Sequence, residues 1–95
     1  MSNAHEVVLR LEIRGVVQGV GYRWSMVQEA RHLALGGWVR NRRDGSVEAV
    51  VAGPAAAVDK IVRWAHRGPR GAQVASVEVF ASEGEFSLFE QRPTA

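Results

Sequence analysis

The sequence has no cysteine, and this absence excludes several classes of protein at once. A chain without thiols has no disulfide scaffold, no zinc–thiolate site, no redox switch and no cysteine nucleophile. Histidine is also sparse, and His5, His32 and His66 stand too far apart to match the spacing of metal ligands. We interpret His32 and His66 as surface side chains of helices, and we expect neither a metal nor a cofactor.

Long hydrophobic runs are missing as well. No apolar stretch approaches the roughly 18 residues that a membrane-spanning helix requires. Residues 1–6 lack the basic start and apolar core of a signal peptide, so the expected location is the cytoplasm. We expect residues 1–5 to form a frayed polar tail. The 95 residues, 46% of them hydrophobic, suit one globular domain spanning residues 1–95, and without a spare apolar element we expect a monomer.

Lysine is nearly absent, because eleven of the twelve basic residues are arginine. Ten acidic residues oppose them and leave a net charge of only +2. The sequence pI of about 9.9 therefore reflects side chains that stay charged until very high pH rather than a large positive charge. Nucleic-acid binding would need these arginines to cluster in a stripe, so composition alone does not predict it.

The first half of the chain contains patterns typical of a strand, a loop and a helix. Val7–Ile13 has apolar residues at alternate positions, which predicts a half-buried strand. Gly15–Gly21 contains three glycines in seven residues and predicts a loop. From Tyr22 to Leu35 apolar residues return at helical spacing, and Gly36-Gly37 is typical of a helix C-cap.

The second half begins with the pattern of a β-hairpin. Trp38–Arg43 and Ser46–Ala52 are predicted strands joined by the turn Asp44-Gly45. Ala55–His66 carries apolar residues at i, i+3, i+4 and i+7, which predicts a second amphipathic helix. After it, the alternation of Val74–Ala81 predicts a strand, and a last short strand is expected over Phe86–Gln91.

This order of elements predicts an α+β fold of the ferredoxin-like split β-α-β type. We expect an antiparallel sheet, two helices on one of its faces and a short extra C-terminal strand. In this topology the loop after the first strand and the end of the second strand can lie near each other. Two candidate functional residues stand at those points.

The first candidate is Arg23, which follows the glycine-rich loop. Glycines let backbone N–H groups converge on an anion, and a helix N-terminus favours negative charge. A cation in the first turn opposes the helix dipole, so Arg23 is better interpreted as a ligand for phosphate or carboxylate than as a stabilising residue. A tight turn followed by a surface arginine is the alternative that the residues leave open.

The second candidate is Asn41, an amide within the predicted strand Trp38–Arg43. Asparagine is a poor strand former. It is either a strand-end residue beside the hairpin turn or a polar group that faces the glycine loop. The sequence by itself leaves both interpretations open.

Two segments resemble the two signatures of the acylphosphatase family. Residues 15–23 read Gly-x-Val-Gln-Gly-Val-Gly-Tyr-Arg, and residues 37–47 read Gly-Trp-Val-Arg-Asn-x-x-x-Gly-x-Val. Gly53 and the stretches Trp64–Pro69 and Ala72–Val74 are also similar to that family. The resemblance covers the chain from about Val7 to Arg92 and implies the same split β-α-β fold.

The resemblance implies a hydrolase of acyl phosphates and assigns roles to particular residues. Arg23 would bind the phosphoryl group, and Asn41 would position the attacking water. The phosphate-binding backbone donors would come from the loop residues Gln18, Gly19, Val20, Gly21 and Tyr22. Inorganic phosphate would be a product and inhibitor, and no metal, nucleic acid or membrane would take part.

Two positions depart from the family pattern. Arg42 follows Asn41 where many relatives carry a small or hydroxyl residue, and Gln91 stands where the last strand usually carries an aliphatic one. Arg42 is expected to alter substrate preference, and Gln91 to loosen the C-terminal strand. Two alternative functions stay open: a non-catalytic anion-binding or regulatory domain, and a ferredoxin-like nucleic-acid-binding module using Trp38 and the basic residues Arg40, Arg42 and Arg43.

Overall fold

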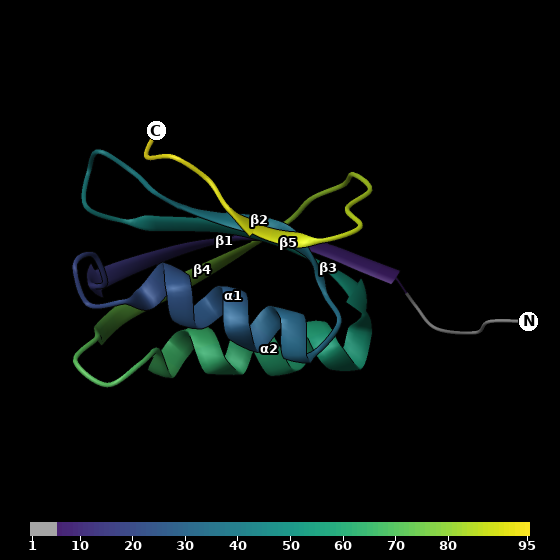
Figure 1. The fold of residues 1–95 in the computed structure, drawn as a ribbon, viewed down its shortest axis with the longest axis horizontal. Coiled ribbons are helices and arrows are strands. Elements are labelled where there is room, and N and C mark those ends of the chain that lie inside the picture. The colour runs from purple at the N-terminus through teal and green to yellow at the C-terminus, as the bar shows by residue number, and fades with distance from the viewer. Residues whose placement is uncertain (1–5) are drawn as a thin grey trace, which may run out of the picture.

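The computed structural model describes residues 6–95, and its elements follow the predicted order, including the short last strand (Figure 1). The elements are β1 (Glu6–Val16), α1 (Tyr22–His32), β2 (Gly36–Asn41), β3 (Val47–Pro54), α2 (Ala55–Arg67), β4 (Gln73–Ala81) and β5 (Phe89–Gln91). The tail predicted for residues 1–5, which includes His5, lies outside the described residues.

The five strands form one sheet in the order β4-β1-β3-β2-β5. The pairs among the first four strands are all antiparallel, and both helices cover the same face (Figure 1). The predicted split β-α-β arrangement is therefore confirmed. The sheet as a whole is mixed rather than antiparallel, because β5 pairs in parallel with β2. Its direction depends on how the chain returns after β4, which the pattern of β5 does not indicate.

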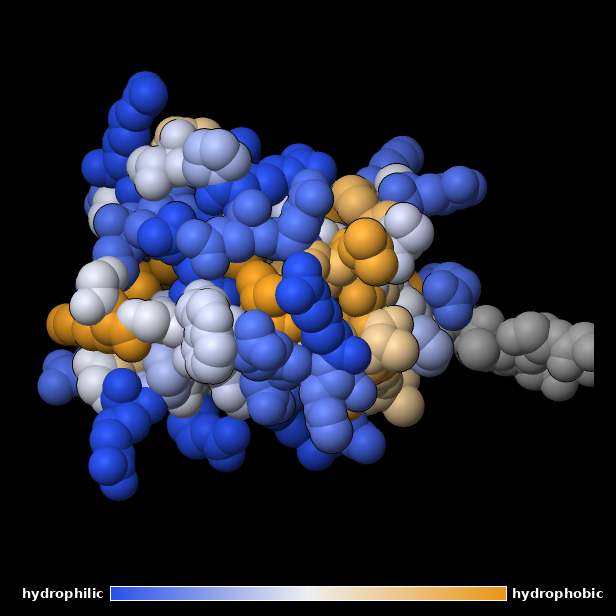
Figure 2. All heavy atoms as spheres, in the orientation of Figure 1, coloured by the Kyte–Doolittle hydropathy of each residue, from blue (hydrophilic) through white to orange (hydrophobic). Residues whose placement is uncertain are grey.

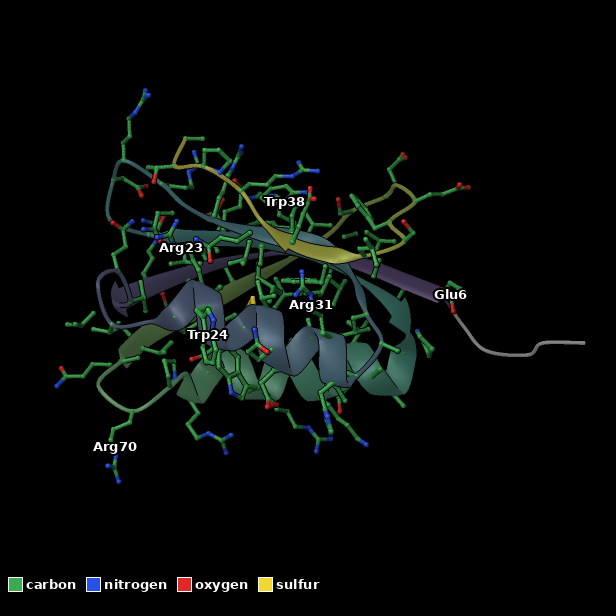
Figure 3. All side chains as sticks on the ribbon, viewed as in Figure 1. Glu6, Arg23, Trp24, Arg31, Trp38 and Arg70 are labelled. Atoms are coloured by element: carbon green, nitrogen blue, oxygen red, sulfur yellow. The ribbon has the colours of Figure 1, made fainter. Side chains whose placement is uncertain are left out.

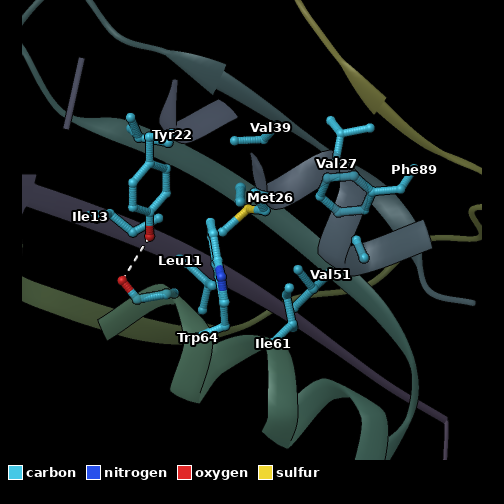
Figure 4. Packing of buried hydrophobic residues seen from close by; sticks show 14 of the residues in the cluster. Leu11, Ile13, Tyr22, Met26, Val27, Val39, Val51, Ile61, Trp64 and Phe89 are labelled. Carbon is cyan, nitrogen blue, oxygen red and sulfur yellow. Dashed lines mark hydrogen bonds between the residues drawn. The ribbon is translucent and has the colours of Figure 1, made fainter. Parts of the chain in front are cut away.

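The core lies between the sheet and the two helices (Figure 4). Alternation along the strands sends every second side chain toward the helices, and Leu11, Ile13 and Val51 are fully buried there. The predicted apolar stripe of α2 is confirmed by Ile61 and its neighbours. Trp64, which was not in that stripe, also packs inward, with its ring centroid 5.2 Å from that of Tyr22.

The end of α1 differs from the prediction. The helix stops at His32 rather than Leu35, and Ala34 takes the left-handed conformation with φ of 57°. Leu35 N–H donates to the Ala30 carbonyl at 2.9 Å and Ala34 N–H to the Arg31 carbonyl at 3.0 Å, which closes the helix as a Schellman motif. The two glycines expected to cap it lie in β2 instead.

Gly37 has a separate reason to be glycine. Its φ is 130°, and a Cβ there would overlap the Val50 carbonyl oxygen of the neighbouring strand.

The hairpin at Asp44-Gly45 forms as predicted, because Asp44 Oδ1 accepts hydrogen bonds from Ser46 N–H at 2.9 Å and from Ser46 Oγ at 2.6 Å. These bonds also lower the pKa of the Asp44 carboxyl.

The loop after β1 is shorter than predicted. β1 continues through Gly15 and Val16, which pair with β4 after a shift of register between Arg14 and Gly15. Such a bulge bends the strand at the point where it leads into the loop. The loop that joins β1 to α1 is therefore reduced to residues 17–21.

Hydrophilic residues cover much of the face of the molecule in Figure 2, and apolar atoms show between them in several places. Arg31 lies between α1 and the sheet (Figure 3), and its Nε donates to the Phe89 carbonyl at 3.2 Å, so α1 is tied to β5. Within residues 6–95, neither helix is long and apolar enough to cross a membrane.

Candidate active site

The loop at residues 17–21 depends on two glycines. Gly19 and Gly21 have φ of 76° and 79°, a left-handed conformation that side chains rarely adopt. No atom lies within 4 Å of a Cβ built at either position. Conformation therefore requires glycine here, and the space in front of the backbone is open to a ligand. Gly21 is also the residue that precedes the first turn of α1.

A pocket of about 270 Å³ lies where this loop meets α1 and the end of β2. Its lining consists of Val17, Gly19, Gly21, Tyr22, Arg23, Trp24, Asn41 and Gln91. The two residues predicted to carry the chemistry thus share one pocket, although they are far apart in the chain. Of the predicted loop residues, Gly19, Gly21 and Tyr22 line the pocket, whereas Gln18 and Val20 do not.

Arg23 extends from the first turn of α1 toward the sheet (Figure 3). That turn contains no acidic residue, and no carboxylate of residues 6–95 lies within ion-pair distance of the Arg23 guanidinium. The helix N-terminus and the guanidinium therefore add their positive charge in one place. An anion at the pocket would meet both.

Asn41 is the last residue of β2 and lies on the helix side of the sheet, like Val39 two positions earlier. Its Oδ1 is buried and accepts no hydrogen bond from any described residue. Buried polar atoms nearly always have a partner, and leaving one unsatisfied costs about 1–3 kcal/mol. The Asn41 carbonyl accepts from Ala95 N–H at 3.0 Å, which fixes the backbone at the end of β2. Asn41 is thus a pocket-lining residue whose side-chain oxygen has no partner among residues 6–95.

Gln18 has a role that sequence reasoning missed. Its Nε2 donates to the Arg42 carbonyl and to the Ser46 carbonyl, both at 2.8 Å. The side chain thus ties the glycine loop to the hairpin that begins directly after Asn41. The two halves of the site are joined through this amide, and nothing in the local pattern of the loop indicates its acceptors.

Tyr22 anchors the other end of the loop. Its hydroxyl donates to the Ala65 carbonyl of α2 at 2.8 Å, and the side chain is buried (Figure 4). Burial raises the pKa of the Tyr22 hydroxyl, so it remains a neutral donor. Any contribution of Tyr22 to anion binding is therefore limited to its backbone.

Trp24 and Gln91 also line the pocket and were not predicted to do so. Trp24 is 66% exposed, although it is a large apolar residue. Gln91 is set beside Val39 by the parallel pairing of β5 with β2, which carries it to the pocket. From the sequence, Gln91 was only an unusual residue for a last strand. Its place in the pocket was not predicted, because the sequence does not indicate which strand β5 pairs with.

Arg42, the other unusual residue, lies away from the pocket. Its Nη1 is 3.6 Å from Glu48 Oε2, on the sheet face that the helices leave open.

Within the described residues, no group of three or more His, Cys, Asp or Glu side chains is arranged to hold a metal ion. The site is thus built from backbone amides, one guanidinium and amide side chains. These features define a small α+β protein with one pocket that joins the loop after β1, the start of α1 and the end of β2.

Comparison with known proteins identifies the family within that class. The acylphosphatase family model matches residues 9–90. An acylphosphatase of Albidiferax ferrireducens is 59% identical over 87 residues, which are 92% of this chain and 95% of that protein. The chain belongs to the acylphosphatase family, and it is accordingly a hydrolase that acts on acyl phosphates.

Solved structures agree with this assignment. The structure of an acylphosphatase from Coxiella burnetii superposes with a TM-score of 0.90 at 32% identity, and the match covers 97% of this chain and all (100%) of that one. The crystal structure of acylphosphatase from Bacillus subtilis gives a TM-score of 0.86 at 33% identity, covering 90% of this chain and 98% of that one.

Proposed function

We propose that the protein hydrolyses the carboxyl–phosphate bond of small acyl phosphates by direct attack of water on a phosphoryl group bound in the pocket. Arg23 and the backbone N–H groups of residues 18–22 hold the phosphoryl oxygens, and Asn41 orients the water. The single observation that carries this proposal is that Arg23 and Asn41 line one pocket. Among residues 6–95, Arg23 has no carboxylate at ion-pair distance and the buried Asn41 Oδ1 has no hydrogen-bond partner.

Binding rests on charge and geometry. The planar guanidinium of Arg23 matches two phosphoryl oxygens, and such charge-assisted bonds are about twice as strong as neutral ones. The helix N-terminus and the left-handed glycines add backbone donors around the same position. Because phosphoryl transfer depends mainly on positioning and electrostatic stabilisation, these groups meet most of its demands.

The attacking water requires one oriented acceptor. Asn41 Oδ1 accepts a hydrogen bond from the water and holds its oxygen in line with the bond that breaks. The water oxygen forms a bond to phosphorus, and the bond from phosphorus to the carboxyl oxygen breaks with its electron pair leaving on that oxygen. The water proton passes to a phosphate oxygen, so that the products are a carboxylate and inorganic phosphate.

The leaving group explains why so few catalytic residues are needed. A carboxylate is a weak base whose conjugate acid has a pKa near about 4, so it departs without protonation. No general acid is required, and the pocket lining has no His, Asp or Glu. We propose further that the reaction uses neither a metal ion nor a phosphoenzyme.

The test is hydrolysis of a synthetic acyl phosphate, with and without chelator, by the wild type and by Asn41→Ala. We expect full wild-type activity in chelator and a loss of about 10²–10³-fold in kcat for the variant, as when one oriented transition-state group is removed. A strict Mg²⁺ requirement would contradict the metal-free reaction. An Asn41→Ala variant that binds phosphate and keeps wild-type kcat would contradict the role of the amide.

Two other functions are less well supported. A purely regulatory anion site would not need a buried, unpartnered Asn41 oxygen. A nucleic-acid module would need an aromatic face free for base stacking. The Trp38 ring has the guanidinium of Arg40 at 4.8 Å from its centroid and that of Arg92 at 4.9 Å, and its exposed fraction is only 9%.

For the state of the protein in the cell, we propose a cytoplasmic monomer that inorganic phosphate, as product, inhibits competitively. Support comes from the small chain and from the polar character of the face in Figure 2. Light scattering after size exclusion tests the monomer, and a dimer mass over the working concentration range would contradict it.

A further inference from the structure

The pocket has two sides with different chemistry. The glycine loop follows β1, whereas Gln91 belongs to β5, and the sheet order sets β3 and β2 between those two strands. Asn41, at the end of β2, lies between the two sides. The loop side carries Gly19, Gly21 and the backbone donors for an anion. The β5 side carries Trp24 and Gln91, neither of which is charged.

Trp24 is the residue on this second side that the fold does not explain. Its neighbours Met26 and Val27 are buried in the core, but Trp24 is 66% exposed and lies on the outer side of the first helical turn (Figure 3). Single exposed apolar residues are common and need no explanation by themselves. Here the indole also lines the pocket, directly after Arg23 in the chain.

We propose that Trp24 and Gln91 form the subsite for the acyl group of the substrate, and that this subsite favours planar, uncharged acyl groups such as aroyl groups. This inference rests on the proposed function, in which the phosphoryl group occupies the loop side. The acyl carbon is joined to that phosphorus through a single oxygen, so it must lie close to Arg23. Trp24 lines the same pocket as Arg23, which brings the indole within reach of the same substrate.

Trp24 and Gln91 have different roles in the proposed subsite. The face of an indole gives apolar contact to a planar group at little loss of conformational entropy, and it prefers offset stacking with another ring. Gln91 extends from the parallel pairing with Val39, and its amide can donate to the acyl carbonyl oxygen. Trp24 therefore sets the preference among acyl groups, and Gln91 assists every acyl phosphate alike.

The experiment compares kcat/KM for benzoyl phosphate and acetyl phosphate in the full chain. For Trp24→Ala we expect kcat/KM to fall more for benzoyl phosphate than for acetyl phosphate, so that the benzoyl-to-acetyl ratio falls by about five- to tenfold. Trp24→Phe keeps most of the ratio. Leu88→Ala is the matched control, since Leu88 is 74% exposed and lies outside the pocket lining, and it leaves the ratio unchanged.

Gln91→Leu separates the second role from the first. We expect kcat/KM to fall by about two- to fivefold for both substrates, with an unchanged ratio. An unchanged ratio in Trp24→Ala, or no loss for either substrate in Gln91→Leu, would overturn the subsite. A failure of the proposed function would be seen in a different measurement. In that case Arg23→Ala would bind inorganic phosphate as tightly as the wild type.

Discussion

The arginines of this molecule occupy two contrasting environments. On the open face of the sheet, Arg10, Arg40 and Arg42 surround Glu48, with nitrogen-to-oxygen distances of 3.4, 2.7 and 3.6 Å. The Glu48 side chain is only 7% exposed. On the helix side, Arg23 lies in a pocket without any carboxylate at ion-pair distance among residues 6–95.

The amide side chains repeat this contrast. Gln18 satisfies its Nε2 with two carbonyls, whereas Asn41 Oδ1 is buried with no partner in the described chain. The paired groups join parts of the fold, whereas the two residues without partners line a common pocket. An incompletely satisfied polar group is therefore the better guide to function here than the abundance of arginine in the sequence.

The largest expected effect comes from changing the unpaired arginine. Arg23→Lys keeps the charge but loses the planar pair of donors, and we expect kcat/KM for an acyl phosphate to fall by about 100-fold or more. The same change in the paired environment, Arg40→Lys, leaves kcat/KM within about threefold. Steady-state kinetics of both variants measure kcat/KM. Equal losses of kcat/KM in Arg23→Lys and Arg40→Lys would contradict the contrast between the two environments.

The next effect concerns stability rather than rate. Glu48→Ala leaves three guanidinium groups facing one another without their shared carboxylate. Because those arginines are 30% to 40% exposed, we expect a loss of about 1–3 kcal/mol in the free energy of unfolding rather than the larger cost of a fully buried pair. Urea unfolding measures it. Unchanged stability, or a large loss of kcat in the folded variant, would show that the open face is not a structural network.

A smaller effect is expected from the paired amide. Gln18→Ala removes both bonds between the loop and the hairpin, so the amides around the phosphoryl group lose their fixed relation to Asn41. We expect kcat to fall by about tenfold with a smaller change in KM. The control is Ser46→Ala, which removes the Ser46 Oγ contact with Asp44 but keeps the Ser46 carbonyl that Gln18 uses. If both variants lose the same activity, Gln18 only stabilises the hairpin.

The smallest effect is a dependence of stability on pH. The hydrogen bond from Arg10 lowers the pKa of the Glu12 carboxyl from 4.5, and the hydrogen bond from Ser46 lowers that of Asp44 from 3.8. The unfolded state therefore takes up protons first as the pH falls. Stability from these groups is fully present above their unfolded pKa values and is lost as the pH falls through the lower, folded ones.

Urea midpoints between about pH 6 and about pH 3 measure this decline. In Glu12→Gln the decline is shallower, because one of the two carboxyls no longer titrates. A midpoint that stays constant down to about pH 3 would contradict the lowered pKa values.

Periodicity in the sequence predicted the order of the elements and most of the core, as the inward stripe of α2 shows. The residue types at two positions singled out Arg23 and Asn41, because the Arg23 charge opposes the helix dipole and asparagine is a poor strand former. The structure brings both into one pocket, and their catalytic roles stay predictions. The parallel direction of β5 was beyond local reasoning, and so was the entry of Gln91 into the pocket, because both depend on pairing between distant segments.

The end of α1 was predicted wrongly for a different reason. Two glycines are the usual sign of a helix C-cap. The chain instead places Ala34 in the left-handed conformation and uses its glycines where β2 comes close to its neighbours. The acceptors of Gln18 could not be predicted either. They are backbone carbonyls, which every residue has, so the sequence does not indicate which of them the side chain contacts.

In the proposed reaction Arg23 binds the phosphoryl group and Asn41 orients the water, and binding of inorganic phosphate to Arg23→Ala and Asn41→Ala tests this division of roles most directly. Calorimetric titration of the folded variants measures it without turnover. We expect Asn41→Ala to bind phosphate within about threefold of wild type, because it loses only the group that orients water, and Arg23→Ala to bind at least about tenfold more weakly. Equal weakening of phosphate binding in both variants would contradict the separation of phosphoryl binding from water positioning.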